Sequence, residues 1–133
     1  MRKTLVVYYS KTGNTRTVAQ AIAGKLSCDL DEITEGGAAQ RDPSAYDLVV
    51  VGTPVNGFNT SIPIQGYLKE NRDKLPNVAF YATYSLWPAG TLGGMEKLAG
   101  KKPVASGTFK SKDIKLGQVA GKVDGFVEAL RRA

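Results

Sequence analysis

The stretch Leu5-Val6-Val7-Tyr8-Tyr9-Ser10-Lys11-Thr12-Gly13-Asn14-Thr15 joins an apolar run directly to a loop rich in hydroxyl groups. The apolar run is short and contains β-branched and aromatic residues, as is typical of a strand buried on both faces. Residues 15–26 then place apolar side chains at helical spacing. We therefore predict a strand over residues 4–9, a tight loop and a helix in immediate succession.

The same alternation of strand and helix patterns continues to the end of the chain. We predict further strands over 30–33, 47–52, 78–82 and 103–109, and helices from residue 62, over 91–98 and over 116–130. Ser61 is expected to cap the helix that begins at residue 62, and residues 35–45 are expected to form a loop with one helical turn. Five buried strands with helical crossovers predict one domain of the doubly wound α/β class, with helices on both faces of a parallel sheet.

The composition excludes several kinds of chemistry. The chain of 133 residues has no histidine, which removes the commonest general base and the commonest transition-metal ligand. Cys28 is the only cysteine, so neither an internal disulfide nor a cluster of thiolate ligands is possible within one chain. We expect no catalytic side chain and no metal site, and any reaction is expected to belong to a bound cofactor.

The charges are divided unevenly along the chain. Residues 27–47 contain six acidic residues against Arg41, whereas residues 97–133 contain nine lysines or arginines against three acids. The basic part is either a set of solvated faces or a surface that attracts an acidic partner. Nucleic acid is not expected, because the lysines lack interleaved aromatic residues, and no apolar run is long enough to cross a membrane. We expect a cytoplasmic protein without a signal peptide.

Ligands of a doubly wound sheet bind beyond the carboxyl ends of its strands, which directs attention to the loops 10–15, 53–60 and 83–91. The first loop offers hydroxyls, the Asn14 side chain and backbone N–H groups at the start of a helix, where the helix dipole favours an anion. Gly13 allows successive N–H groups to point inward. These features favour a terminal phosphate, and the alternative is an ordinary capped turn.

The segment Val6-Val7-Tyr8-Tyr9-Ser10-Lys11-Thr12-Gly13-Asn14-Thr15-Arg16-Thr17-Val18-Ala19 resembles the signature of the flavodoxin family. The similarity of element order covers nearly the whole chain, as in a short-chain member. The resemblance implies the strand order 2-1-3-4-5, a three-layer sandwich and FMN as the cofactor. It also implies that the first loop binds the 5′-phosphate, through Ser10, Lys11, Thr12, Gly13, Asn14 and Thr15.

By the same resemblance, the second and third loops hold the isoalloxazine ring. The residues concerned are Thr53, Pro54, Val55, Asn56, Gly57 and Phe58 in the second loop, and Thr83, Tyr84, Ser85 and Trp87 in the third. Asn56 stands where the family usually has an aromatic residue, so Phe58 is a candidate to stack on the ring, and Gly57 is a candidate to bond flavin N5 through its backbone. Tyr84 or Trp87 is expected to cover the other face. Neither loop contains an acidic residue, so the anionic reduced flavin should be less destabilised than in acidic family members.

Three functions are compatible with these features. The first is an electron carrier, a monomer or weak dimer, that exchanges electrons with redox partner proteins bearing acidic docking surfaces. The second is an FMN-dependent oxidoreductase of the NAD(P)H–quinone type. The third is a binding module of the same fold without redox activity, which the replacement of the usual aromatic by Asn56 keeps open.

Overall fold

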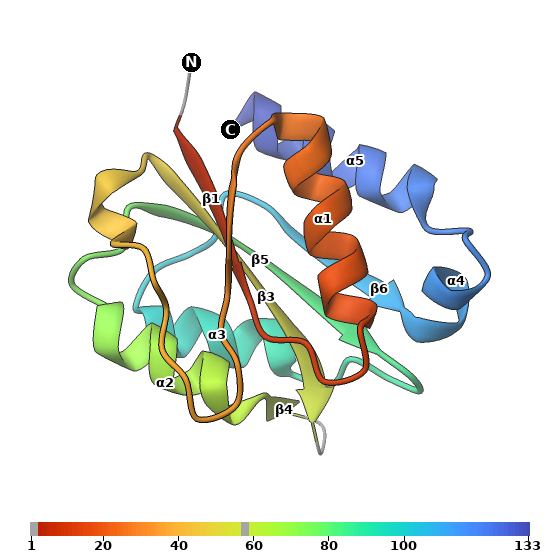
Figure 1. Cartoon of the computed structure of the whole chain (residues 1–133), viewed down its shortest axis with the longest axis horizontal. Helices are drawn as coiled ribbons and strands as arrows, with labels where there is room; N and C mark the ends of the chain where they lie inside the picture. The colour runs from red at the N-terminus through yellow and green to blue at the C-terminus, as the bar shows by residue number, and fades with distance from the viewer. Residues whose placement is uncertain (1–2, 57–58) are drawn as a thin grey trace.

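The structure is a computed structural model that describes residues 3–56 and 59–133 (Figure 1). Its elements are β1 (Thr4–Tyr8), α1 (Asn14–Leu26), β2 (Asp29–Glu32), the 3-10 helix η1 (Pro43–Ala45), β3 (Leu48–Asn56), β4 (Asn59–Thr60), α2 (Ile62–Asn71), β5 (Asn77–Tyr84), α3 (Thr91–Ala99), β6 (Ser106–Lys110), α4 (Ser111–Lys115) and α5 (Ala120–Arg132). Among these residues, no helix is both long and apolar enough to cross a bilayer.

The sheet has the strand order β2-β1-β3-β5-β6, and these five strands are parallel. Counted among the parallel strands alone, this is the predicted order 2-1-3-4-5. The short β4 lies off this path and pairs with β3 in the antiparallel direction. The predicted fold class is therefore confirmed, with one additional short strand.

Helices cover both faces of the sheet, with α1 and α5 on one face and α2 and α3 on the other (Figure 1). Successive residues of a strand point to opposite faces, so each central strand contributes to two separate cores. Val6 and Val50 pack toward α1 and α5, whereas Leu5, Val49 and Phe80 pack toward α2 and α3, and all five are fully buried. Because the central strands are covered on both sides, they read in sequence as continuous apolar runs.

The C-terminal part of the chain differs from the prediction. The last strand lies at 106–110 instead of 103–109, and the residues that follow form the helix α4, which was not predicted. Gly117 has a φ of 69° and follows the end of α4, so the predicted helix from residue 116 is interrupted and α5 begins only at Ala120. Val119 is nevertheless buried in the core, as its place in the helical pattern predicted.

The crossover between β2 and β3 contains no α-helix and consists of a strap, residues 34–42, followed by η1. The predicted loop with one helical turn is confirmed. Buried Asp31 at β2 fixes the strap, because its carboxylate accepts hydrogen bonds from the backbone amides of Gln40 and Arg41 at 2.9–3.1 Å. At the opposite edge of the sheet from the loops that follow β1, β3 and β5, Thr4 of β1 and Arg131 of α5 line one cavity, so β1 begins and α5 ends on the same side of the molecule (Figure 1).

Candidate functional site

The three predicted loops leave the same edge of the sheet. Tyr8 of β1 is in register with Gly52 of β3, and Gly52 is in register with Tyr81 of β5. Because these strands are parallel neighbours, the segments that follow these residues extend in the same direction. The amide of Tyr9 donates to the carbonyl of Gly52 over 3.3 Å and joins the base of the first loop to the second.

The first loop turns into α1 through Gly13, which has a φ of 96° and occupies the N-cap position. A non-glycine side chain rarely adopts this backbone conformation. Gly13 has no side chain with which to cap the helix, and the hydroxyl of Ser10 does so instead. It accepts hydrogen bonds from the amides of Gly13 and Arg16, each over 3.1 Å. The Ser10 hydroxyl, predicted as a phosphate ligand, therefore stabilises the loop conformation through these two hydrogen bonds.

Four other amides of this loop point to no protein acceptor. Within residues 3–56 and 59–133, no hydrogen bond is formed by the N–H groups of Lys11, Thr12, Asn14 and Thr15. The first N–H groups of a helix have no partner inside the helix, and the positive end of the helix dipole lies among them. A group with several anionic oxygens supplies the acceptors that these donors lack, so the donor set fits a phosphate.

A buried pair of hydroxyls joins the first loop to the third. Thr15 Oγ1 and Thr83 Oγ1 are 2.8 Å apart, and the hydroxyl of Tyr81 donates to the carbonyl of Thr15 over 3.0 Å. The Thr15 side chain, predicted to bind phosphate, is thus engaged within the protein, whereas Thr12 is exposed. Any contribution of Thr15 and Thr83 to a ligand would have to come from the backbone or from a shared hydroxyl.

The second loop is part of a β-ribbon. β3 extends four residues beyond Gly52, and its end pairs with β4 through Val55–Thr60 and Asn56–Asn59. The fully buried Thr53 hydroxyl lies 2.8 Å from the hydroxyl of Ser61 and accepts from its amide over 3.1 Å, so Ser61 takes the predicted N-cap position but bonds to β3.

Pro54 and Val55 are half-buried and line a cavity of about 200 Å³ together with Lys11 of the first loop. Gly57 and Phe58 lie outside the described residues. Ring stacking by Phe58 and the backbone role of Gly57 therefore remain predictions.

The third loop presents apolar side chains to solvent. Leu86 is 87% exposed and Trp87 is 63% exposed, whereas Tyr84 at the end of β5 is half-buried. Ser85 is exposed between them. A large aromatic face at this edge of the sheet is the kind of surface on which a planar ring stacks. Both Tyr84 and Trp87 remain candidates for that contact.

A charged network beside the first loop could not be foreseen from the loop motif alone. Arg16 binds both carboxylate oxygens of Glu32 over 2.8 and 2.9 Å, and the Tyr8 hydroxyl donates to the same carboxylate over 2.7 Å. The bonds from Arg16 lower the pKa of Glu32, and burial followed by the bond to Glu32 raises the pKa of Tyr8 to about 12. The signal in the sequence is indirect, since Tyr8 and Glu32 face each other only once β1 and β2 pair. The network holds the guanidinium near the start of α1.

Comparison with known proteins agrees with this geometry. Residues 5–110 match the family model described as the flavodoxin domain. A flavoprotein from Lactobacillus acidophilus, solved in complex with FMN, is 20% identical with a TM-score of 0.71, over 87% of this chain and 98% of that chain. The two-electron reduced flavodoxin of Megasphaera elsdenii is 16% identical with a TM-score of 0.68, over 90% of this chain and 98% of that chain.

A longer protein contains a similar fold. The rubredoxin oxygen:oxidoreductase of Desulfovibrio gigas is 15% identical with a TM-score of 0.64, and the match covers 99% of this chain but 37% of that chain. No curated protein matches the sequence significantly.

Proposed function

Because this chain belongs to the flavodoxin domain family, we propose that it binds FMN at the carboxyl edge of its sheet and carries electrons between larger redox proteins. The FMN complex of the L. acidophilus flavoprotein supports the choice of cofactor. The resemblance found in the sequence is confirmed at the level of the family and the fold. The role as an electron carrier goes beyond both and is our inference.

One observation carries the cofactor assignment. The amides of Lys11, Thr12, Asn14 and Thr15 lack acceptors within the described residues, and they gather at the start of α1 where Gly13 turns the chain. An anion bound there receives hydrogen bonds from groups that are already ordered, so little conformational entropy is lost on binding. The hydroxyl of Thr12 and the side chain of Asn14 add further contacts, and no cation is required to hold the phosphate.

The flavin, when bound, accepts and returns electrons. The chain's own residues bind and orient it: the first loop holds the phosphate, while the ribbon of β3 and β4 and the third loop enclose the ring. The hydrogen bond between Thr15 and Thr83 keeps the first and third loops at a fixed separation. The exposed face of Trp87 offers one stacking surface, and the positions of Pro54 and Val55 offer the opposite wall.

Binding of FMN and of riboflavin, compared side by side, tests this assignment. We expect FMN to bind and to keep its visible absorption through gel filtration, and riboflavin, which lacks the phosphate, to bind far more weakly. Replacing Thr12 with Val and Asn14 with Ala together should reduce the affinity for FMN and leave that for riboflavin unchanged. Equal affinities for the two flavins, or none for either, would exclude a phosphate grip at this loop.

The docking surface of the proposed carrier lies beside the third loop. A hollow of about 400 Å³ is lined by Ser85 of that loop and by Lys112, Lys115 and Leu116 at α4. Leu116 is 59% exposed, and neither lysine forms an ion pair within the described residues. An apolar centre with a cationic rim suits a partner whose docking surface is apolar at its centre and acidic at its edge.

Small redox probes of opposite charge test this surface. Reduced protein should transfer electrons to ferricyanide faster at low than at high ionic strength, because basic residues attract the anion. The double substitution Lys112→Glu with Lys115→Glu should slow this reaction and accelerate transfer to hexaammineruthenium. Lys122→Glu on the exposed face of α5 serves as the control and should change both rates far less. Equal effects of the two charge reversals would argue against a docking surface at α4.

The oxidoreductase alternative is decided by one assay. The FMN-loaded protein is incubated with NADPH or NADH and a quinone, and consumption of the nicotinamide is followed. We expect none beyond the rate given by free FMN, whereas catalytic turnover would replace the carrier by an enzyme. We also propose a cytoplasmic monomer or weak dimer, which cell fractionation and sedimentation would check.

A further inference from the structure

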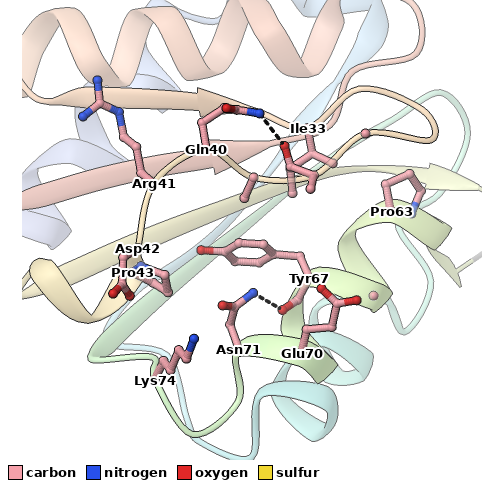
Figure 2. Close-up of a pocket in the computed structure, with 14 residues that line it drawn as sticks. Ile33, Gln40, Arg41, Asp42, Pro43, Pro63, Tyr67, Glu70, Asn71 and Lys74 are labelled. Atoms are coloured by element: carbon pink, nitrogen blue, oxygen red, sulfur yellow. Dashed lines mark hydrogen bonds between the residues drawn. The ribbon is translucent and has the colours of Figure 1, made fainter.

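A cavity bordered by α2 lies outside the proposed cofactor site. It has a volume of about 520 Å³ and separates the strap from α2, with residues 37–43 on one side and Gly66, Tyr67 and Asn71 on the other (Figure 2). This volume is in the range of small-molecule sites, roughly 300–1,000 Å³. The cavity contains none of the residues predicted to bind FMN.

The cavity lies where the crossover from β2 to β3 lacks an α-helix. The strap is thin, and Asp31 holds it through the amides of Gln40 and Arg41. On the facing side, α2 contributes Gly66, where an added Cβ would meet nothing within 4 Å. Small residues thus form part of each wall, and the hydrogen bonds to Asp31 fix the strap on its side of the cavity.

The hydroxyl of Tyr67 is the second observation. Tyr67 is only 4% exposed, and its side chain extends from α2 across the cavity toward Asp42 and Pro43 (Figure 2). Its oxygen is buried and has no hydrogen-bond partner among the described residues. Burial, and then the nearby carboxylates of Asp31 and Asp42, raise the pKa of Tyr67, so the group stays protonated. A buried donor without an acceptor is costly and rare in folded proteins.

The charged groups around the cavity oppose one another. Arg41 and Lys74 stand against Asp42 and Glu70. Arg41 already contacts Asp29, and Asp42 accepts the hydrogen bonds that start η1. Lys74 and Glu70 form no ion pair within the described residues, but the two cations and two carboxylates of the lining sum to no net charge that would select an ion of one sign. The rest of the wall combines alanine, proline, glycine and isoleucine with the polar side chains of Gln40, Tyr67 and Asn71.

We propose that this cavity binds a small neutral molecule that has both polar and apolar surface and carries a carbonyl oxygen, with the Tyr67 hydroxyl donating to that oxygen. The prolines at positions 43 and 63 contact the apolar part of the ligand. Binding requires a small outward movement of the strap, since the Tyr67 oxygen is buried. This site does not depend on FMN.

Coumarin, a neutral aromatic lactone, is a suitable probe. It is titrated into ¹⁵N-labelled protein in the presence of excess FMN, so that any flavin site is already filled, and amide shifts are followed by NMR. We expect saturable shifts confined to residues 37–43 and 63–74. Coumarin-3-carboxylate, which adds a negative charge, should bind more weakly because the lining carries no net positive charge to offset the desolvation of the carboxylate.

Two variants distinguish the contribution of the Tyr67 hydroxyl from that of the cavity volume. Tyr67→Phe should weaken coumarin binding by about tenfold, the effect of one lost hydrogen bond of ~1.4 kcal/mol. It should not lower the melting temperature, because no protein partner of the hydroxyl is lost. Gly66→Leu should abolish binding by filling the cavity. Gly125→Leu is the matched control, since this glycine also lies in a helix with open space at its Cβ, and should leave binding unchanged.

Four results would overturn the proposal. The first two are the absence of amide shifts up to the solubility limit of coumarin, and shifts centred on the loops 10–15, 53–60 and 83–91 instead of the strap. The other two are equal affinity of wild type and Tyr67→Phe for coumarin, and a clearly lower melting temperature of Tyr67→Phe. The last would show that the hydroxyl has a protein partner after all. Failure of FMN binding alone would leave the expected shifts at the strap unaffected, so the two proposals fail separately.

Discussion

Replacing Ser10 with Ala removes the acceptor that caps α1. The hydroxyl holds the amides of Gly13 and Arg16 at 3.1 Å each, and both residues are partly exposed, so water replaces it in the unliganded variant. The loss resembles that of an N-cap side chain and should destabilise the protein by about 1 kcal/mol. For a chain of 133 residues, the unfolding entropy converts this into a melting temperature lower by about 4 °C.

Ser10→Ala should lower the affinity for FMN by more than its effect on the free energy of unfolding suggests. Without the Ser10 hydroxyl, the loop that aligns the amides of Lys11, Thr12 and Asn14 loses one of its internal supports, and the phosphate must order it on binding. We expect the affinity for FMN to fall by roughly tenfold, equivalent to ~1.4 kcal/mol, while the weaker affinity for riboflavin stays the same. Fluorescence titration of the two flavins measures both.

Ser106→Ala is the control, because Ser106 is exposed at the start of β6, at the far end of that strand from the loops. It should change neither the melting temperature nor either affinity. If Ser10→Ala melted lower but bound FMN as tightly as wild type, the Ser10 hydroxyl would be a helix cap only. If FMN and riboflavin affinities fell together, the loop would contact the ring instead of the phosphate.

Three further predictions concern the surroundings of the site. Arg16 lowers the pKa of Glu32, so the stabilisation by Glu32 is present above its unfolded pKa and is lost as the pH falls through its folded pKa. Glu32→Gln should therefore lower the free energy of unfolding at pH 7, measured with urea, and make its decrease between pH 7 and pH 3 shallower. A decrease as steep as that of wild type would contradict this. Gly52→Ala should lower the free energy of unfolding by about 3 kcal/mol in the same assay, because the added Cβ would collide with the Tyr81 ring. A urea midpoint equal to that of wild type would show that the ring can move. Burial, and then a neighbouring carboxylate, raise the pKa of Cys28 to about 11, so iodoacetamide at pH 8 should alkylate the folded protein far more slowly than the urea-unfolded chain; equal rates would refute the shift.

Much of the fold could be predicted because its strands are buried on both faces. After their first positions, runs such as 47–52 and 78–82 contain no polar residue that would favour another assignment. The parallel direction of the strands follows from the helices that connect them. The two residues of β4 and the five of α4 could not be predicted, since neither is long enough to show a period. Gly117 was the available signal for the break between α4 and α5.

The candidate site was predictable in position but not in the assignment of individual bonds. The sequence places Ser10, Thr12 and Thr15 in one loop, but only the folded chain shows that Ser10 caps the helix and that Thr15 pairs with Thr83, 68 residues away. Such contacts depend on the packing of three strands and are invisible to local patterns. The cavity at Tyr67 was likewise unpredictable, because it lies where the chain between β2 and β3 forms a strap and no α-helix.

The position of Thr4 and Arg131 around one cavity has a consequence for engineering. A linker that spans this cavity would close the described fold into a ring, on the side remote from the loops 10–15, 53–60 and 83–91. Ring closure leaves the native contacts alone and restricts only the denatured ensemble, so it should raise the thermal midpoint without altering cofactor affinity.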